Sequence, residues 1–202
     1  YFASLPYIDS QRVACFGWSF GGYMTLMELS SPDSPFKAGV SMAPVTDWKF
    51  YDSIYTERYM LRPQQNESGY EISSTLNKTH NMNAKLLIMS GTADDNVHIS
   101  NTFTYTSKLT SEGKIFDKYR KTHLTLSELK LGLVPGDAIK VFDLPIGKIG
   151  ILICWDQWFT QASKEIEKQG AEMLFWLTRG YHEERQVTRA RDTGMYIITS
   201  HP

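Results

Sequence analysis

The stretch "RVACFGWSFGGYMTLMEL", residues 12–29, decides the fold of the first half of the chain. Its first five residues form an apolar run with the length of a buried strand, and the residues after Gly21 carry apolar side chains at helical spacing. Between these segments, Gly17, Ser19 and Gly21 form a Gly-x-Ser-x-Gly turn. Such a turn between a strand and a helix exposes the serine hydroxyl at the carboxyl end of the strand. We therefore predict that Ser19 is a nucleophile.

Further apolar runs repeat the alternation of strand and helix. Residues 37–44 and 84–91 predict two more buried strands, and residues 99–113 predict a helix after the second of them. Residues 62–71 are polar and predict a loop. Strands that are continuous apolar runs and alternate with helices indicate a parallel sheet, so the predicted fold class is α/β.

A nucleophilic serine needs a base and a carboxylate that orients the base. Asp94 follows the predicted strand at 84–91, on the sheet edge where parallel α/β proteins carry their chemistry. The local sequence is equally consistent with a carboxylate that only closes a turn. The backbone N–H of Phe20, directly after the serine, would stabilise an oxyanion. The aromatic residues at 48–59 would be assigned to the core on composition alone.

Residues 6–114 resemble the catalytic domain of the dipeptidyl peptidase IV and prolyl oligopeptidase family. The matching stretches are "GWSFGGYM", "FKAGVSMAPVTDWKFYDSIYTERYM" and "LLIMSGTADDNVH". The resemblance implies an α/β-hydrolase sheet and a serine peptidase that cleaves after proline. Ser19 would be the nucleophile, Asp94 the acid of the triad, and Asn96 a ligand of the substrate carbonyl. The residues that would line a proline-accepting pocket are Val45, Trp48, Tyr51, Tyr55 and Val97.

The histidine that should complete this triad has no counterpart in a matching context. In the family it lies on a loop after the next strand, and the resemblance ends near residues 114–117. His123 is 29 residues after Asp94, close to the expected separation, but its context is "YRKTHL". His123 is therefore an open alternative as the base for Ser19 and not part of the predicted catalytic set, because its setting does not match that of the family's histidine.

The sequence changes character from about residue 114. One helix is predicted at residues 160–171, and the strand-like segments are residues 114–124, 138–156, 171–180 and 195–202. Three stretches, "YRKTHL", "GKIGILICWDQWF" and "ARDTGMYIITS", resemble the nitrilase, or carbon–nitrogen hydrolase, superfamily over residues 118–202.

This second resemblance implies a thiol-dependent hydrolase of small amides or N-carbamoyl compounds. Cys154 would be the nucleophile, and Lys121 would stabilise the tetrahedral anion. The catalytic glutamate of the superfamily comes from an earlier strand, and no upstream glutamate lies in such a context. We interpret Glu128 and Glu165 as carboxylates on helix surfaces.

The two resemblances predict two parts, an α/β-hydrolase fragment at residues 1–117 and a nitrilase-like fragment at residues 118–202. The fold class is thus a partial α/β-hydrolase sheet joined to a partial nitrilase-like α/β segment. Our interpretation is a composite, produced by fusion, by a misassembled frame or by joining of separate stretches. A serine peptidase is the first functional hypothesis, because pocket residues accompany its nucleophile. A carbon–nitrogen hydrolase and an inactive hybrid are the alternatives, and we expect little or no activity from this chain.

Composition excludes several other classes. A net charge of −1 leaves no basic stripe, so we expect no nucleic-acid partner. No apolar run reaches the roughly 18 residues that a membrane helix needs, so we expect no membrane partner. Cys15 and Cys154 cannot form a disulfide framework, and we interpret Cys15 as a buried thiol. We expect a peptide or small amide substrate, no cofactor and no metal; an oligomer and any compartment remain open.

Overall fold

The chain forms two compact units, Tyr1–Phe116 and Asp117–Pro202, which we describe separately as unit 1 and unit 2. The computed structural model describes residues 4–91, 94–114, 118–144, 146–178, 180 and 182–199.

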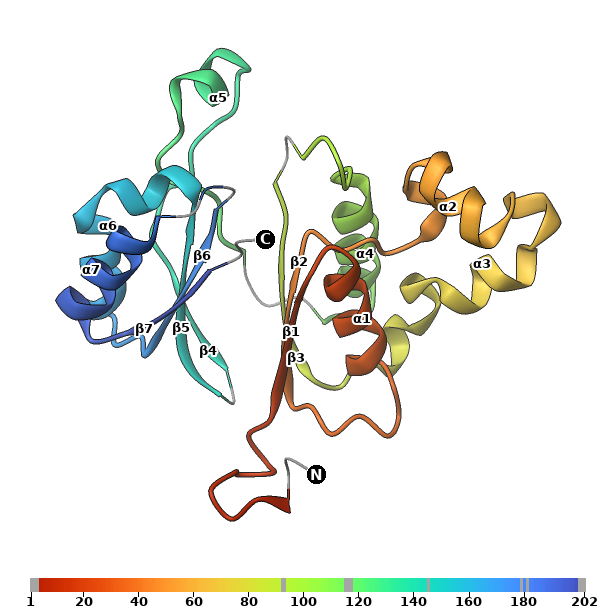
Figure 1. Ribbon diagram of the computed structural model, residues 1–202, viewed down its shortest axis with the longest axis horizontal. Helices are drawn as coiled ribbons and strands as arrows, with labels where there is room; N and C mark the ends of the chain where they lie inside the picture. Colours follow the sequence, from red (N-terminus) through yellow and green to blue (C-terminus); the bar gives the residue numbers. More distant parts are fainter. Residues whose placement is uncertain are drawn as a thin grey trace. The chain divides into compact units, whose positions relative to one another are not determined.

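Unit 1 is built on three parallel strands in the order β1–β2–β3 (Figure 1). They are β1 (Ala14–Trp18), β2 (Ala38–Met42) and β3 (Lys85–Met89). The parallel α/β sheet predicted for this half is therefore confirmed. β1 begins two residues later than predicted and ends next to the serine turn, because its pairing with β2 continues to Trp18.

Helices α1 (Phe20–Leu29) and α4 (Ser100–Ser111), both predicted, lie on one side of this sheet (Figure 1). Their buried side chains share one core, to which the strands contribute from the face that the helices cover. A fully buried leucine side chain contributes about 1.5–3 kcal/mol to such a core. The core residues are Leu26, Leu29, Met82, Tyr105 and Leu109, with Cys15, Leu86 and Ile88 packed against them.

A long connection between β2 and β3 carries most of the aromatic residues. Its elements are η2 (Trp48–Phe50), α2 (Ser53–Met60), η3 (Pro63–Gln65), α3 (Glu67–Ser73) and η4 (Thr75–Asn81). The prediction of a loop at residues 62–71 is therefore wrong. The burial of Tyr70 stabilises helix α3, because this residue is 1% exposed and its hydroxyl donates to the Leu61 carbonyl at 2.8 Å.

Unit 2 contains a mixed sheet of four strands in the order β4–β5–β6–β7. The strands are β4 (Val141–Leu144), β5 (Gly147–Ile153), β6 (Met173–Leu177) and β7 (Tyr196–Thr199). β4 pairs antiparallel with β5, and the remaining pairs are parallel. The segment predicted as strand-like at 138–156 thus forms two strands.

Helices α6 (Thr160–Lys168) and α7 (Glu183–Thr193) lie on one side of this sheet (Figure 1). α6 was predicted and α7 was not, while the short α5 (Leu126–Lys130) carries Glu128, which was predicted to lie on a helix. The sequence of α7, "EERQVTRARDT", is polar over most of its length, so it lacks the apolar periodicity on which the prediction relied. The core of this unit comprises Leu152, Ala162, Ile166, Ala171, Leu174, Trp176 and Met195.

Four predicted strand segments contain positions outside the described residues, which are single positions in two of them, residue 145 in 138–156 and residue 179 in 171–180. Of residues 114–124, positions 115–117 lie outside, and the described remainder forms no strand. Of residues 195–202, positions 200–202 lie outside, while the preceding residues form β7. Within the part of the chain that the structure describes, no helix is both long and apolar enough to cross a membrane.

Candidate active site

Ser19 occupies the single position between the last residue of β1 and the first residue of α1. Its backbone has φ 55° and ψ −114°, a conformation that costs a non-glycine residue about 1–3 kcal/mol. The Ser19 N–H donates to the Met42 carbonyl of β2 at 2.9 Å, which ties the turn to the neighbouring strand. The sharp turn predicted from the sequence is therefore present at the carboxyl edge of the sheet.

Two glycines permit this turn. A Cβ at Gly17 would lie 2.1 Å from the Gly21 carbonyl oxygen, and a Cβ at Gly22 would lie 2.7 Å from the Met42 oxygen. A Cβ at Gly21 would meet no heavy atom within 4 Å. Close packing thus requires Gly17 and Gly22, whereas Gly21 belongs to the sequence motif without being sterically needed.

Beside the serine lies a cavity of about 160 Å³. Ligand pockets commonly have about 300–1,000 Å³, so this cavity has room for one side chain and not for a whole peptide. It brings together the predicted nucleophile and five of the predicted substrate-binding residues. Its lining consists of Ser19, Phe20, Val45, Trp48, Tyr51 and Tyr55.

The aromatic rings of this cavity contact one another in a fixed arrangement. Trp48 stacks on Tyr55 with ring centroids 6.0 Å apart, and Tyr51 meets both rings edge-on. Trp48 is 6% exposed, as expected for a core residue, but Tyr55 is 42% exposed. Assigning the whole aromatic segment to the core is therefore wrong at Tyr55, which reaches the surface.

Asp94 lies beyond the end of β3, and its Oδ1 closes a turn. That oxygen accepts the backbone N–H groups of Asn96 and Val97, each at 3.0 Å. Among the described residues, no donor to Oδ2 is seen. The geometry thus shows the turn role of Asp94 and is compatible with the predicted triad role.

Asn96 and Val97 lie near the cavity but outside its lining. Asn96 is exposed, and its Oδ1 accepts the Tyr51 hydroxyl at 3.0 Å. Val97 is 4% exposed and packs in the cluster that contains Val45 and Trp48. Val97 therefore packs behind the residues that line the cavity, and its predicted contact with a ligand stays a prediction.

No histidine in the described part of unit 1 contacts Ser19 or Asp94. The Nδ1 of His98 lies 2.9 Å from the Ser100 hydroxyl. His123, the candidate base, belongs to unit 2, where its Nδ1 lies 3.1 Å from Asp156 Oδ1 and its ring stacks on Phe159. The structure therefore shows no base on the serine among the described residues.

Asn101 is a residue of this site that the sequence did not reveal. It is fully buried at the start of α4, where its Oδ1 accepts the Thr46 N–H at 2.8 Å and its carbonyl accepts the Thr46 hydroxyl at 2.8 Å. Its Nδ2 also donates to the Phe50 carbonyl at 3.3 Å. Asn101 thus fastens the aromatic segment to α4. A polar residue in a predicted helix carries no signal for this role.

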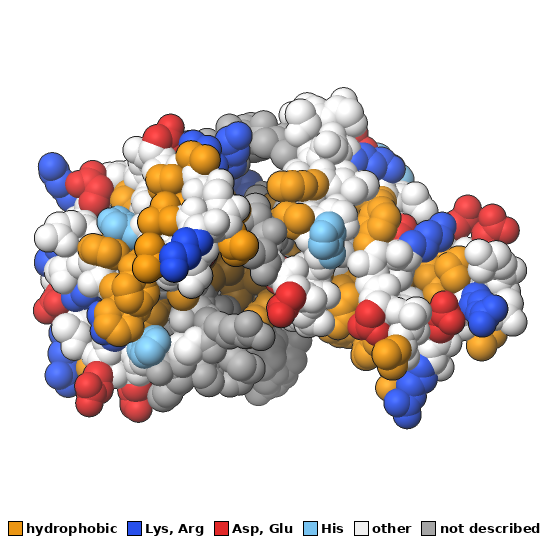
Figure 2. Space-filling model, turned by 90° about the horizontal axis from the view of Figure 1, so that it is seen from above, with side chains coloured by type: hydrophobic (Ala, Val, Ile, Leu, Met, Phe, Trp, Pro, Cys, Tyr) orange, Lys and Arg blue, Asp and Glu red, His pale blue; other side chains and the backbone are white. Residues whose placement is uncertain are grey.

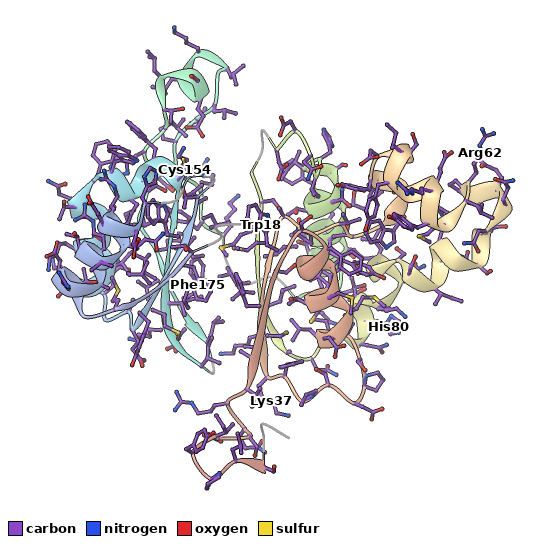
Figure 3. All side chains as sticks on the ribbon, in the orientation of Figure 1. Trp18, Lys37, Arg62, His80, Cys154 and Phe175 are labelled. Carbon is purple, nitrogen blue, oxygen red and sulfur yellow. The ribbon has the colours of Figure 1, made fainter. Side chains whose placement is uncertain are left out.

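In unit 2, Cys154 directly follows β5 and also has a positive φ, 47° (Figure 3). Its carbonyl accepts the Trp176 indole N–H at 3.1 Å. Asp156, two residues later, is fully buried and was not predicted to matter. It accepts hydrogen bonds from the Ile153 N–H, the His123 N–H and the Tyr119 hydroxyl. Asp156 therefore ties residues 119–123 to the turn that holds Cys154.

Lys121, the predicted cation, pairs with a carboxylate that was predicted to lie on a helix surface. Its Nζ lies 2.8 Å and 2.6 Å from the two carboxylate oxygens of Glu128, and the Lys121 side chain is 9% exposed. Burial acts to raise the pKa of Glu128, but hydrogen bonds from Lys121 and Thr125 bring it below the ordinary value. Glu128 lies on helix α5 with a side chain that is 26% exposed, so it is a partly exposed helix carboxylate with an ion-pair partner that was not predicted, and Glu165 is exposed on α6 as predicted.

The Cys15 side chain is half-buried against the core below α1. Burial raises the pKa of its thiol to about 11, so the protonated form dominates at neutral pH. The described residues contain no cluster of three or more His, Cys, Asp or Glu side chains suited to a metal ion.

In unit 1, the first strand of a parallel sheet is followed by a serine with positive φ and then by a helix, and a cavity lined by aromatic side chains lies beside the serine. This arrangement defines a site of the α/β-hydrolase type. Residues 1–122 match the model of the prolyl oligopeptidase family, and the chain belongs to this family.

Several individual proteins are also similar to this chain in sequence or structure. A probable dipeptidyl-aminopeptidase B of Arthroderma gypseum is 55% identical over 106 residues, which are 52% of this chain and 12% of that relative. The crystal structure of Porphyromonas gingivalis dipeptidyl peptidase 4 is 50% identical, with a TM-score of 0.55, over 57% of this chain and 16% of that one. A putative dipeptidyl aminopeptidase IV from Bacteroides ovatus is 36% identical, with a TM-score of 0.53 and coverage of 56% and 16%. The chain thus spans about an eighth of the length of the Arthroderma gypseum relative.

Proposed function

We propose that unit 1 carries the nucleophile and the specificity pocket of a serine dipeptidyl peptidase that cleaves after proline. The observation that carries this proposal is the cavity of about 160 Å³ beside Ser19, walled by Trp48, Tyr51 and Tyr55. A pyrrolidine ring is apolar and compact, so it would fill such a space and contact the ring faces. The names of the relatives support the dipeptidyl specificity.

In this proposal, Ser19 Oγ attacks the carbonyl carbon of the residue held in the cavity. The first N–H groups of a helix have no partner inside it, so the Phe20 N–H is available to the oxyanion. Collapse of the tetrahedral intermediate releases the amine and leaves an acyl-serine, which water then hydrolyses. The proton of Ser19 must go to a base, and Asp94 Oδ2 would orient that base.

We expect slow turnover at best from the 202-residue chain. The described residues place no base on Ser19, and loss of a triad member leaves only the catalysis that arises from the oxyanion hole and binding. Hydrolysis of an X-Pro substrate at a rate typical of enzymes would contradict this expectation.

A fluorophosphonate probe tests the proposal directly. We expect a single adduct on Ser19 in the intact mass, mapped by peptide sequencing and absent in Ser19→Ala, if a base is within reach. The variant His123→Ala then decides whether this histidine is the base, since labelling would fall to the level of Ser19→Ala. A folded chain with the correct mass and no adduct on Ser19 would show that the serine is not activated in this chain.

A second candidate function belongs to unit 2, because Cys154 shares the strained geometry of Ser19 at the end of a strand. We propose a thiol-dependent hydrolysis of a small amide or N-carbamoyl compound, in which Lys121 stabilises the anion. Ammonia release from an amide substrate that is lost in Cys154→Ala and retained in Ser19→Ala would support it. If neither activity appears in a cooperatively folded chain, the composite of two incomplete sites is the better description.

A further inference from the structure

The surface next to the proposed pocket continues its aromatic wall. The cavity holds one side chain, so the rest of a peptide ligand must cross exposed surface. Tyr55 belongs to the cavity lining and is also 42% exposed. Exposed side chains next to Tyr55 are therefore candidates to contact the ligand residue that adjoins the one in the cavity.

Tyr59 provides that extension. It lies one helical turn after Tyr55 on α2, and the two rings meet edge to face with centroids 5.1 Å apart. The Tyr59 side chain is 67% exposed, so most of its ring faces solvent. Hydrophobic side chains reach the surface among charged ones on this side of unit 1 (Figure 2).

Arg58 places a positive charge beside the ring of Tyr59. Its Cζ lies 5.7 Å from the centroid of Tyr59, within the range of a cation–π contact. No carboxylate among the described residues forms an ion pair with Arg58. Arg62, by contrast, lies 3.6 Å from Glu57 at the outer end of the α2 region (Figure 3). Of these two exposed arginines, only Arg58 therefore has its N–H donors uncommitted to a carboxylate.

We propose that Tyr59 and Arg58 form a second subsite, which binds an acidic side chain on the ligand residue next to the one in the cavity. The ring of Tyr59 packs against the aliphatic part of a glutamate, and the guanidinium of Arg58 donates to its carboxylate. This inference rests on the proposed function, because it assumes that a peptide residue occupies the cavity beside Ser19.

Calorimetric binding of two dipeptide amides to the Ser19→Ala protein tests the subsite without turnover. The probes are Glu-Pro-NH₂ and Gln-Pro-NH₂, which differ only in charge at the residue in question. An exposed ion pair adds little to affinity, so we expect the glutamate peptide to bind about two- to fivefold tighter at low salt. The preference should decrease as the salt concentration rises.

Two matched variants locate the effect. Arg58→Gln should abolish the preference for glutamate, whereas Arg62→Gln should leave it unchanged. Tyr59→Leu should weaken binding of both peptides, because the packing surface is lost for either side chain. A preference that survives Arg58→Gln or disappears with Arg62→Gln would overturn the proposal.

The remaining outcomes separate this inference from the proposed function. Equal affinities for the two peptides, both lost in Tyr55→Ala, would confirm the cavity and overturn the second subsite. Absence of binding by either peptide to a chain whose α1 amides are protected from exchange would overturn the cavity assignment and the subsite with it.

Discussion

Ser19 and Cys154 share an uncommon backbone conformation at the end of a strand. Each directly follows the last residue of a strand, and each has a positive φ, 55° and 47° respectively. A side chain held in this way projects from the edge of the sheet, and the strain of about 1–3 kcal/mol is offset by the surrounding structure. The same solution therefore occurs in both units, although the residues and their neighbours differ.

The glycines around Ser19 give the first prediction. Gly17→Ala should destabilise unit 1 by about 1–3 kcal/mol, because its Cβ would overlap the Gly21 carbonyl. Gly21→Ala, the matched control in the same motif, should be neutral or stabilise by up to about 1 kcal/mol, since its Cβ meets open space. Both effects are measured as shifts in the urea midpoint of unfolding, with hydrogen exchange of peptides from α1 as the readout. Equal destabilisation by the two substitutions would contradict the packing argument.

The Lys121–Glu128 pair predicts a pH dependence. The pKa of Glu128 is lower in the folded than in the unfolded state, where it is about 4.3. The stabilisation is therefore present above this value and is lost as the pH falls through the folded pKa. The melting temperature of unit 2 should fall between about pH 5 and pH 3, and less steeply in Glu128→Gln. An unchanged slope in Glu128→Gln would show that other carboxylates dominate.

Among the elements, the segment between β2 and α2 decides the shape of the site. It contains Val45, Trp48 and Tyr51, and its conformation is fixed from outside by side chains that lie far away in the sequence. Asn101 of α4 holds Thr46, and Asp47 accepts the Ser74 hydroxyl at 2.8 Å. The pocket is therefore a property of packed elements rather than of the aromatic segment alone.

Asn101 gives the prediction at this scale. Asn101→Ala would leave the buried N–H of Thr46 without its acceptor, and an unsatisfied buried group costs about 1–3 kcal/mol. We expect a loss of this size in the stability of unit 1, together with weaker binding of Pro-containing peptides. Asn83→Ala, at an exposed asparagine of the same unit, is the control and should change neither. Intact peptide binding in Asn101→Ala would show that the segment holds its shape unaided.

At the scale of the whole molecule, the chain consists of two units with separate cores. Leu26 belongs to a core made of unit 1 residues, and Leu174 to one made of unit 2 residues. A single free energy of unfolding is then not defined for the chain, because two-state behaviour is expected of single domains.

Calorimetry tests this division. We expect two unfolding transitions, one lowered by Leu26→Ala and the other by Leu174→Ala. Each substitution removes a fully buried side chain and should cost about 2–5 kcal/mol in its own transition. A single transition that both variants shift equally would show that the two units unfold as one.

The sequence by itself determined much of the first unit. Apolar runs bounded by turn residues predicted β1, β2, β3, α1 and α4, because a buried strand or helix must carry its hydrophobic residues in a regular pattern. The Gly-x-Ser-x-Gly turn was equally local, since its conformation depends on residues that touch one another along the chain. The pattern failed for α3 and α7, where polar residues form helices through the burial of a few side chains such as Tyr70.

Only the tertiary structure decided which side chains meet. It placed Tyr55 on the cavity and Val97 beneath it, and it paired Lys121 with Glu128. It also showed two buried acceptors, Asn101, which fastens the aromatic segment to α4, and Asp156, which ties residues 119–123 to the turn that holds Cys154. The physical reason is that such contacts join residues at irregular separations, from seven positions for Lys121 and Glu128 to 55 for Thr46 and Asn101, and so leave no periodic trace in the sequence. Local patterns therefore reveal strands, helices and sharp turns, whereas the partners of a buried polar group follow from packing alone.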